Sequence, residues 1–265
     1  MTSSTPDALW SARAVRVLRP TAIACRDISR RVRGVRLLER FSLSVPVGAR
    51  VLLVSRPEES ASVLLRILAG LSPGHGERVE LAGVIDPKRA GWSRRVAHVG
   101  PGPGLYGWMS PREALQLSAG LHELAADEAE TQIAAAIERY RLGQVLDEPM
   151  VRGGEPLLER VALATAMLSD PEVVLLDEPL RAIEPEERRR LLRLPGQRRT
   201  VVLASRYPAS EEGLCNQVVF IRGGRLALSA PIARLAELGL PLSMRGIEAL
   251  AERDAVSAAV APAVT

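Results

Sequence analysis

The feature that most constrains the fold is Val173-Val174-Leu175-Leu176, an uninterrupted apolar run that leads into Asp177 and Glu178. A strand with one side in solvent alternates polar and apolar residues. A continuous apolar run therefore predicts a strand that is buried on both faces of a parallel sheet. A charged helical segment at 185–194 and a second apolar strand at 200–205 follow it. Strands that alternate with helices in this way indicate an α/β fold.

Glycine and proline mark out the rest of the chain. Residues 1–20 are polar and small with interspersed arginines, and we expect a flexible N-terminal arm there. The cluster Gly100-Pro101-Gly102-Pro103-Gly104 separates the first predicted strands from a helical block near 105–152, which is expected to be an inserted subdomain. Strands at 217–222 and 225–229 flank Gly223-Gly224 and predict a hairpin. Residues 231–265 are expected to form a short amphipathic helix and an Ala/Val-rich tail.

Composition excludes several classes of protein. With 47% hydrophobic and 25% charged residues, the 265-residue chain has the balance of a folded globular protein. Its apolar runs are far shorter than the roughly 20 residues that a membrane-spanning helix needs. The formal charge of +4 comes from arginines scattered along the sequence, since Lys88 is the one lysine. Cys25 and Cys215 have no metal or redox spacing, so we expect buried thiols in a reducing compartment and a cytoplasmic protein.

The segment Asp170-Pro171-Glu172-Val173-Val174-Leu175-Leu176-Asp177-Glu178-Pro179 resembles the Walker B segment of an ATP-binding cassette (ABC) ATPase. Four other segments resemble further parts of this family in the same order and spacing. Residues 64–71 resemble the helix after the phosphate loop, and 104–115 resemble the start of the helical subdomain. Residues 160–164 resemble the helix after the signature motif, and 218–228 resemble the C-terminal hairpin.

The resemblance covers about residues 21–235 and implies a P-loop NTPase-like cassette of the α/β class, with a mixed sheet core and an inserted α-helical subdomain. It implies a RecA-like ATPase core with antiparallel β elements, formed by 21–100 and 157–235. The helical and signature subdomain would span 101–156, and 236–265 would be a C-terminal tail.

The phosphate loop of this family reads GPNGAGKST, in which backbone N–H groups and the lysine hold the phosphates of ATP and a hydroxyl holds Mg²⁺. This chain reads Ser55-Arg56-Pro57-Glu58-Glu59-Ser60-Ala61-Ser62-Val63 there. Ala61 stands at the lysine position, and two carboxylates stand where phosphate would sit. Residues 62–71 are predicted to be a helix whose start is capped by these acidic residues, Ser60 or Ser62.

The resemblance implies ATP and Mg²⁺ as cofactors, with Ser55, Ser60, Ala61, Ser62, Val63 and Asp177 at the cofactor-binding positions. The missing lysine and glycines argue against nucleotide binding by this chain. The competing interpretation is that Arg56 replaces the lysine.

Other family positions are altered as well. The adenine-stacking aromatic aligns with Val32, the glutamine that senses Mg²⁺ with Pro101, the switch histidine with Arg206, and the aspartate after Walker B with Glu184. The signature, LSGGQ in the family, aligns without gaps on Gly153-Gly154-Glu155-Pro156-Leu157. After a two-residue shift it aligns on Val151-Arg152-Gly153-Gly154-Glu155, and the sequence leaves both registers open.

Asp177 and Glu178 are retained. In the family the first orders the water shell of Mg²⁺ and the second polarises the attacking water. Asp177 is thus a metal-binding residue only if Mg²⁺ binds. Glu178 keeps the catalytic position but is expected to be inactive, because phosphoryl transfer depends on positioned phosphates more than on one base. Both residues also fit a strand end that is held by hydrogen bonds.

The resulting hypothesis is a degenerate, pseudo-ATPase subunit of an ABC transporter, peripheral on the inner face of the cell membrane. It would pair with a competent ABC ATPase subunit or with itself, and would dock on membrane-spanning subunits through Tyr106, Trp108 and Met109, unless these pack in the core. One alternative is an active ABC ATPase with an atypical phosphate loop. Another is a regulatory or nucleic-acid-binding module that reuses the fold, although we find no groove-entering element and expect no nucleic-acid partner.

Overall fold

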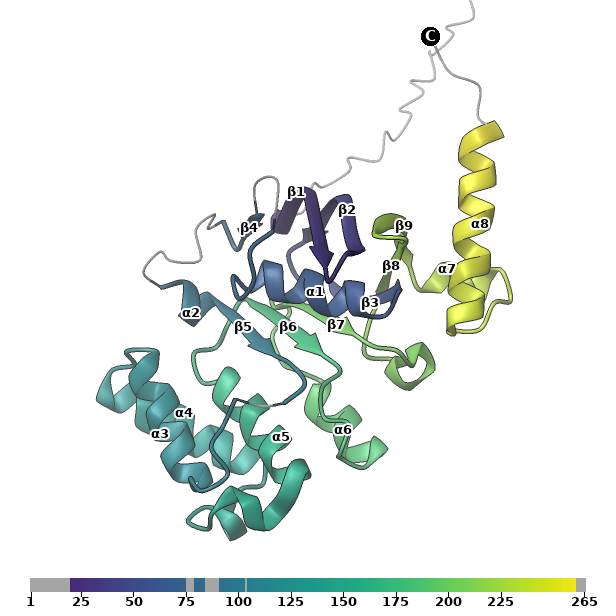
Figure 1. Cartoon of the computed structure of the whole chain (residues 1–265). Helices are drawn as coiled ribbons and strands as arrows, with labels where there is room; N and C mark the ends of the chain where they lie inside the picture. Colours follow the sequence, from purple (N-terminus) through teal and green to yellow (C-terminus); the bar gives the residue numbers. More distant parts are fainter. Residues whose placement is uncertain (1–19, 75–78, 84–90, 103, 261–265) are drawn as a thin grey trace, which may run out of the picture.

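The computed structural model describes residues 20–74, 79–83, 91–102 and 104–260. Figure 1 shows a central sheet with helices packed around it. This six-stranded sheet has the order β5-β6-β7-β3-β8-β9. All neighbouring pairs are parallel except β8 and β9, which form the predicted antiparallel hairpin. The strands are β3 (Arg50–Arg56), β5 (Val96–Val99), β6 (Val173–Asp177), β7 (Thr200–Ala204), β8 (Gln217–Arg222) and β9 (Arg225–Pro231).

Strand β6 lies inside this sheet, between β5 and β7, and every one of its residues is buried. Val173 and Leu175 join the apolar cluster on one face of the sheet, whereas Val174 and Leu176 join the cluster on the other face. The uninterrupted apolar run is thus explained by burial on both sides, as predicted. The mixed sheet confirms the α/β class.

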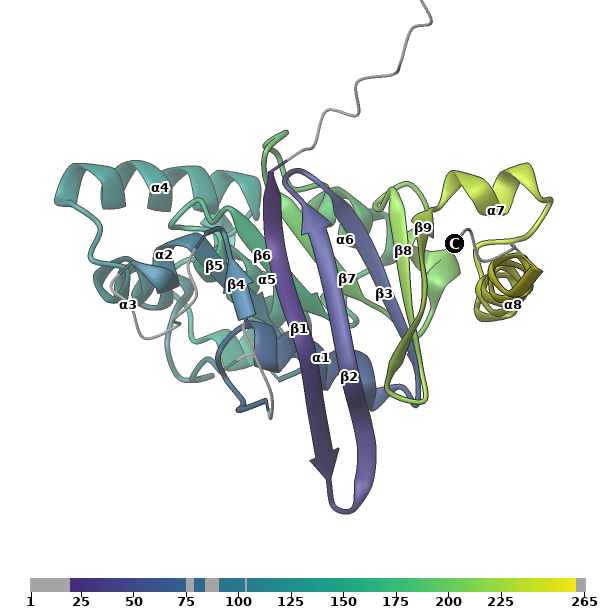
Figure 2. The same cartoon turned by 90° about the horizontal axis from the view of Figure 1, so that it is seen from above.

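A second, antiparallel sheet has the order β2-β1-β4 and consists of β1 (Thr21–Val32), β2 (Val35–Pro46) and β4 (Val79–Leu81). Helix α1 (Glu59–Leu68) packs against strands of both sheets, and its buried residues include Leu64, Leu65 and Leu68. Figure 2 shows β1 and β2 as a long hairpin whose turn projects beyond the neighbouring elements.

A group of helices lies to one side of the main sheet (Figure 1) and contains α3 (Pro111–Leu121), α4 (Ala126–Arg139) and α5 (Gly154–Ala166). The short helices η1 (Gly143–Val145) and η2 (Met150–Gly153) lie between α4 and α5, and another short helix, α2 (Trp92–Arg95), directly precedes β5. Ser110 and Glu113 form a reciprocal capping box at the start of α3, with Pro111 in the first turn. This local pattern fixes where α3 begins.

After β6 the chain forms α6 (Pro185–Leu192), η3 (Pro208–Glu211), α7 (Ala233–Glu237) and α8 (Met244–Val260). Residues 236–265, expected from the sequence to be a tail, therefore contain a 17-residue helix. Ile247, Leu250 and Ala251 of α8 are buried in the main apolar cluster, which explains why this helix is packed. The expected arm at 1–19 and Lys88 lie outside the described residues. Within the described part of the chain, no helix has the length and apolar character needed to cross a membrane.

Candidate functional site

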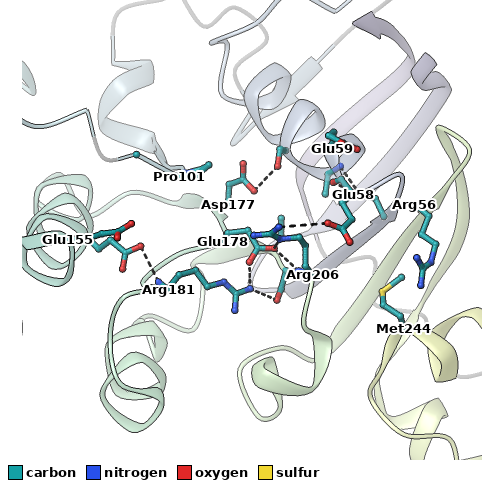
Figure 3. Close-up of a pocket in the computed structure, with 17 residues that line it drawn as sticks. Arg56, Glu58, Glu59, Pro101, Glu155, Asp177, Glu178, Arg181, Arg206 and Met244 are labelled. Carbon is teal, nitrogen blue, oxygen red and sulfur yellow. Dashed lines mark hydrogen bonds and ion pairs between the residues drawn. The ribbon is translucent and has the colours of Figure 1, made fainter. Parts of the chain in front are cut away.

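A cavity of about 550 Å³ opens where β3, β6 and β7 end (Figure 3). The carboxyl ends of parallel strands meet at one edge of a sheet, where α/β proteins commonly hold their ligands. The structure brings together here eleven positions that the sequence comparison with the family singled out: Ser55, Arg56, Glu58, Glu59, Ala61, Ser62, Pro101, Glu155, Asp177, Glu178 and Arg206. Gly102, Glu159, Arg181, Ala204, Ser205 and Met244 complete the lining.

The loop before α1 is closed by its own side chains. The Ser55 hydroxyl donates a hydrogen bond to the carbonyl oxygen of Glu58 at 2.8 Å and accepts the N–H of Ala61 at 3.0 Å. The N–H of Ser60 donates to the carbonyl of Pro57 at 3.2 Å. Two N–H groups at the start of α1, which an anion at a helix N-terminus would use, therefore already have partners.

The predicted capping of α1 was wrong in its residues. Glu58, at the N-cap, makes no side-chain capping bond. Ser60 is fully buried and donates to the carbonyl of Leu37 at 2.7 Å, while Ser62 donates to a carboxylate oxygen of Asp177 at 2.9 Å. Ser55 acts as the cap because the loop folds its side chain back over the helix start. Val63 packs beside the apolar cluster under α1.

Asp177 is buried at the end of β6. Burial raises the pKa of its carboxyl group; the hydrogen bond from Ser62 opposes this rise, and the nearby charge of Glu178 adds to it. A hydroxyl beside a carboxylate is an oxygen pair that Mg²⁺ accepts. However, the described residues contain no cluster of three or more His, Cys, Asp or Glu arranged to hold a metal.

Both carboxylate oxygens of Glu178 are engaged. One accepts the backbone N–H of Arg206 at 2.6 Å, and the Arg206 side chain lies 3.4 Å from the same oxygen. The other contacts the Arg181 guanidinium. The side chain is only 12% exposed. Both oxygens that could contact a water molecule are therefore already occupied by protein groups.

Arg181 connects Glu178 to a buried polar cluster that the sequence did not predict. It donates to the Ser205 hydroxyl at 2.9 Å, and Ser205 donates to Glu211 at 2.7 Å. Glu211 is fully buried and accepts both terminal nitrogens of Arg188 at 3.0 Å. The position of Arg181, three residues after Glu178, was the available sequence signal. The pairing of Arg188 with Glu211 depends on tertiary structure.

The charge of the cavity does not suit a triphosphate. Six carboxylates face three guanidinium groups in its lining: Glu58, Glu59, Glu155, Glu159, Asp177 and Glu178 against Arg56, Arg181 and Arg206. Arg56 is paired with Glu248 of α8 at 2.5 Å, so it does not take the place of the missing lysine. The residues present therefore do not fit Mg²⁺-bound ATP.

Several predicted residues lie outside the cavity lining. Val32 is at the turn of the β1–β2 hairpin, Glu184 precedes α6, and Arg152 is an exposed residue of η2. Gly153 and Gly154 stand at the start of α5, a position compatible with either signature register.

The three residues assigned to docking differ in their exposure. Tyr106 and Trp108 are 62% and 69% exposed, and their rings stack at 5.6 Å between centroids. Met109 is buried in the main apolar cluster, so its side chain is not part of that exposed surface.

The fold and the cavity together define a P-loop NTPase-like cassette. Comparison with known proteins agrees. A profile of the family described as ABC transporter matches residues 38–181. A solved ATP-binding subunit of an ABC transporter superposes with a TM-score of 0.77 over 88% of this chain and 100% of that chain. At 21% identity this likeness shows the fold alone.

Two curated relatives support the same assignment. The aliphatic sulfonates import ATP-binding protein of Rhizobium johnstonii is 32% identical over 224 residues, which are 80% of this chain and 78% of that protein. An uncharacterized ABC transporter ATP-binding protein of Nostoc sp. is 27% identical over 214 residues, which are 75% of this chain but only 61% of that protein. The chain belongs to the ABC transporter family, among its ATP-binding subunits.

Proposed function

We propose that this chain is a cassette subunit of an ABC transporter that neither binds nor hydrolyses ATP and that supports a competent partner ATPase. The observation that carries this proposal is the closed loop before α1. Ala61 stands in the lysine position, and the N–H of Ala61 is already bonded to Ser55 at 3.0 Å. The missing lysine removes the charge that would hold the β- and γ-phosphates, and the occupied N–H groups are not free to bind them. Both differences oppose ATP binding.

The state of Glu178 supports the same conclusion. A general base must reach the attacking water, yet this carboxylate is engaged by Arg181 and by the N–H of Arg206. The buried Arg188–Glu211 pair anchors this cluster through Ser205. These residues therefore have a structural role: they fix the conformation of the chain at the end of β6.

An exposed surface patch around Tyr106 and Trp108 indicates where a partner subunit would bind. Val151 is 65% exposed, and its N–H donates to the carbonyl of Gly107 at 2.8 Å, which places it beside the stacked pair Tyr106 and Trp108. Exposed aromatic residues are rare on free surfaces and frequent in interfaces. We assign this patch to a membrane-spanning subunit, which would hold the cassette on the cytoplasmic face of the cell membrane.

Titration calorimetry with Mg·ATP tests the proposal directly. The wild-type chain should give no binding heat at millimolar nucleotide. Ala61→Lys is the gain-of-charge variant, and Ala69→Lys, at the far end of α1, is its matched control. Micromolar binding by the wild type, with ATP turnover that Glu178→Gln abolishes, would instead establish an active ATPase with an atypical loop.

The partner is tested by purifying the intact complex from its native membrane. A second, different cassette together with membrane-spanning subunits is the expected composition. Two copies of this chain with no other cassette would contradict the pairing with a competent ATPase. Trp108→Ala should release the chain from the membrane-spanning subunits without lowering its melting temperature, because the side chain is exposed.

A further inference from the structure

The β1–β2 hairpin carries an unusual share of the charge of the chain. Six arginines and two carboxylates lie between Thr21 and Pro46, an excess of four positive charges. This equals the formal net charge of the whole chain, +4, so the remaining residues balance to zero. This locally arginine-rich segment thus forms one projecting element (Figure 2).

Most of these arginines have no partner among the residues that the structure describes. Arg26, Arg31, Arg33 and Arg40 are exposed, and Arg30 is half-buried. In the described part of the chain, none of the five makes a side-chain hydrogen bond or an ion pair. Arg36 contacts Glu39, which Arg225 of β9 also contacts at 3.2 Å. The hairpin therefore presents five guanidinium groups that have no partner among the described residues.

The local structure of the hairpin works against its own folding. Arg31 and Arg36 are direct cross-strand neighbours, an arrangement in which like charges destabilise a sheet. Arg33 and Gly34 form the two-residue turn. Arg33 has a φ of 49° there, a backbone conformation that favours Asn, Asp or Gly. Residues that disfavour their own local structure, as these arginines do, are expected at sites that serve a function other than folding.

The tip of the hairpin combines these charges with apolar groups. Val32 and Val35 are cross-strand partners that flank the turn and are 37% and 55% exposed. Apolar residues surrounded by arginines fit the boundary between headgroups and acyl chains, where guanidinium groups meet lipid phosphates. A single-stranded nucleic acid would require stacking aromatic rings, but the one aromatic residue of the hairpin, Phe41, is fully buried.

We propose that the tip of the β1–β2 hairpin is a contact site for an anionic lipid surface. Val32 and Val35 enter the headgroup region, while Arg30, Arg31, Arg33 and Arg36 bind lipid phosphates. This site is separate from the nucleotide cavity and needs no ATP. It rests on the proposed function only in that a transporter subunit has a bilayer within reach.

The test is flotation of the full chain with vesicles of phosphatidylcholine, with and without phosphatidylglycerol. The wild type should float only with the anionic vesicles, and high salt should release it. The variant Arg31→Thr/Arg33→Asn should lower its affinity for these vesicles about tenfold or more. These replacements suit a strand and a tight turn, so the variant should also melt at a higher temperature than the wild type.

The matched control is Arg189→Gln/Arg198→Gln, which removes the same charge from exposed positions outside the hairpin. It should float like the wild type, whereas Val32→Ser/Val35→Ser should bind more weakly. Equal loss in the control and the hairpin variant would overturn the proposal. Binding to duplex DNA without binding to anionic vesicles would overturn it in favour of nucleic acid. Neither result depends on the calorimetric test of ATP binding, so the two proposals can fail separately.

Discussion

The Ser62 hydroxyl donates a hydrogen bond to Asp177 at 2.9 Å and joins the first turns of α1 to the last residue of β6. In the ABC resemblance these two positions serve Mg²⁺. Here each is the direct partner of the other, on the edge of a cavity in which carboxylates outnumber guanidinium groups. The contact therefore acts as a link between two elements of the core.

The first prediction concerns Asp177→Asn. Burial raises the pKa of the Asp177 carboxyl above its ordinary value of 3.8. The native state thus favours the neutral form, and the stabilisation this gives is lost as pH rises through the native pKa. Asn stays neutral, so the variant should be more stable than the wild type near pH 7, and the difference should shrink toward acid pH. Urea unfolding across this range measures it, and a pH-independent difference would show that the assigned cause is wrong.

The second prediction concerns the buried Arg188–Glu211 pair. Arg188→Met leaves the fully buried Glu211 without its bidentate partner and should lower the free energy of unfolding by about 3–5 kcal/mol. Arg189→Met, at the exposed neighbouring position, should change it by less than about 0.5 kcal/mol. Chemical denaturation gives both values. Arg188→Met/Glu211→Met should recover much of the loss, because no buried charge remains unpaired.

The third prediction concerns α8, which was expected to be part of a tail. Leu250→Ala should lower the free energy of unfolding by about 2–5 kcal/mol, because Leu250 is fully buried in the main cluster. Val256→Ala, at an exposed position of the same helix, should have almost no effect. Similar melting temperatures for the two variants would mean that α8 is not packed on the core.

The fourth prediction concerns the two thiols. Burial raises the pKa of Cys25 to about 11 and that of Cys215 to about 12. Because the thiolate is the reactive form, neither should be alkylated by iodoacetamide in the native protein at pH 8. Both should react in urea, and mass spectrometry counts the adducts. Rapid labelling of either residue in the folded chain would contradict the raised pKa of its thiol.

Local patterns predicted the elements well. The apolar run of β6 and the glycines between β8 and β9 each act over a few residues, so they could be recognised in the sequence. The order of family-like segments predicted the cassette, and the family match confirmed it. The sequence indicated a short amphipathic helix within 231–265. It did not predict the 17-residue helix at 244–260, because the burial of that helix depends on a surface built by residues far away in the chain.

The sequence indicated which positions to examine for the site, but not which side chains contact one another there. The missing lysine at Ala61 and the acidic loop were visible in the sequence. The cap by Ser55, the engagement of Glu178 by Arg181 and the pair of Arg56 with Glu248 were not. Each of these contacts depends on the direction of a side chain, and that direction is set only when the surrounding elements pack.

The sequence by itself determined the class of fold, because hydrophobic periodicity and turn residues act locally and must agree with the final structure. It also determined which chemical groups the cavity lacks. The tertiary structure decided which of the remaining charges meet. It buried Glu211 with Arg188, turned Ser62 toward Asp177 and paired Arg56 with Glu248. Electrostatic interactions depend on distance in space and on burial, and neither is set by separation along the chain.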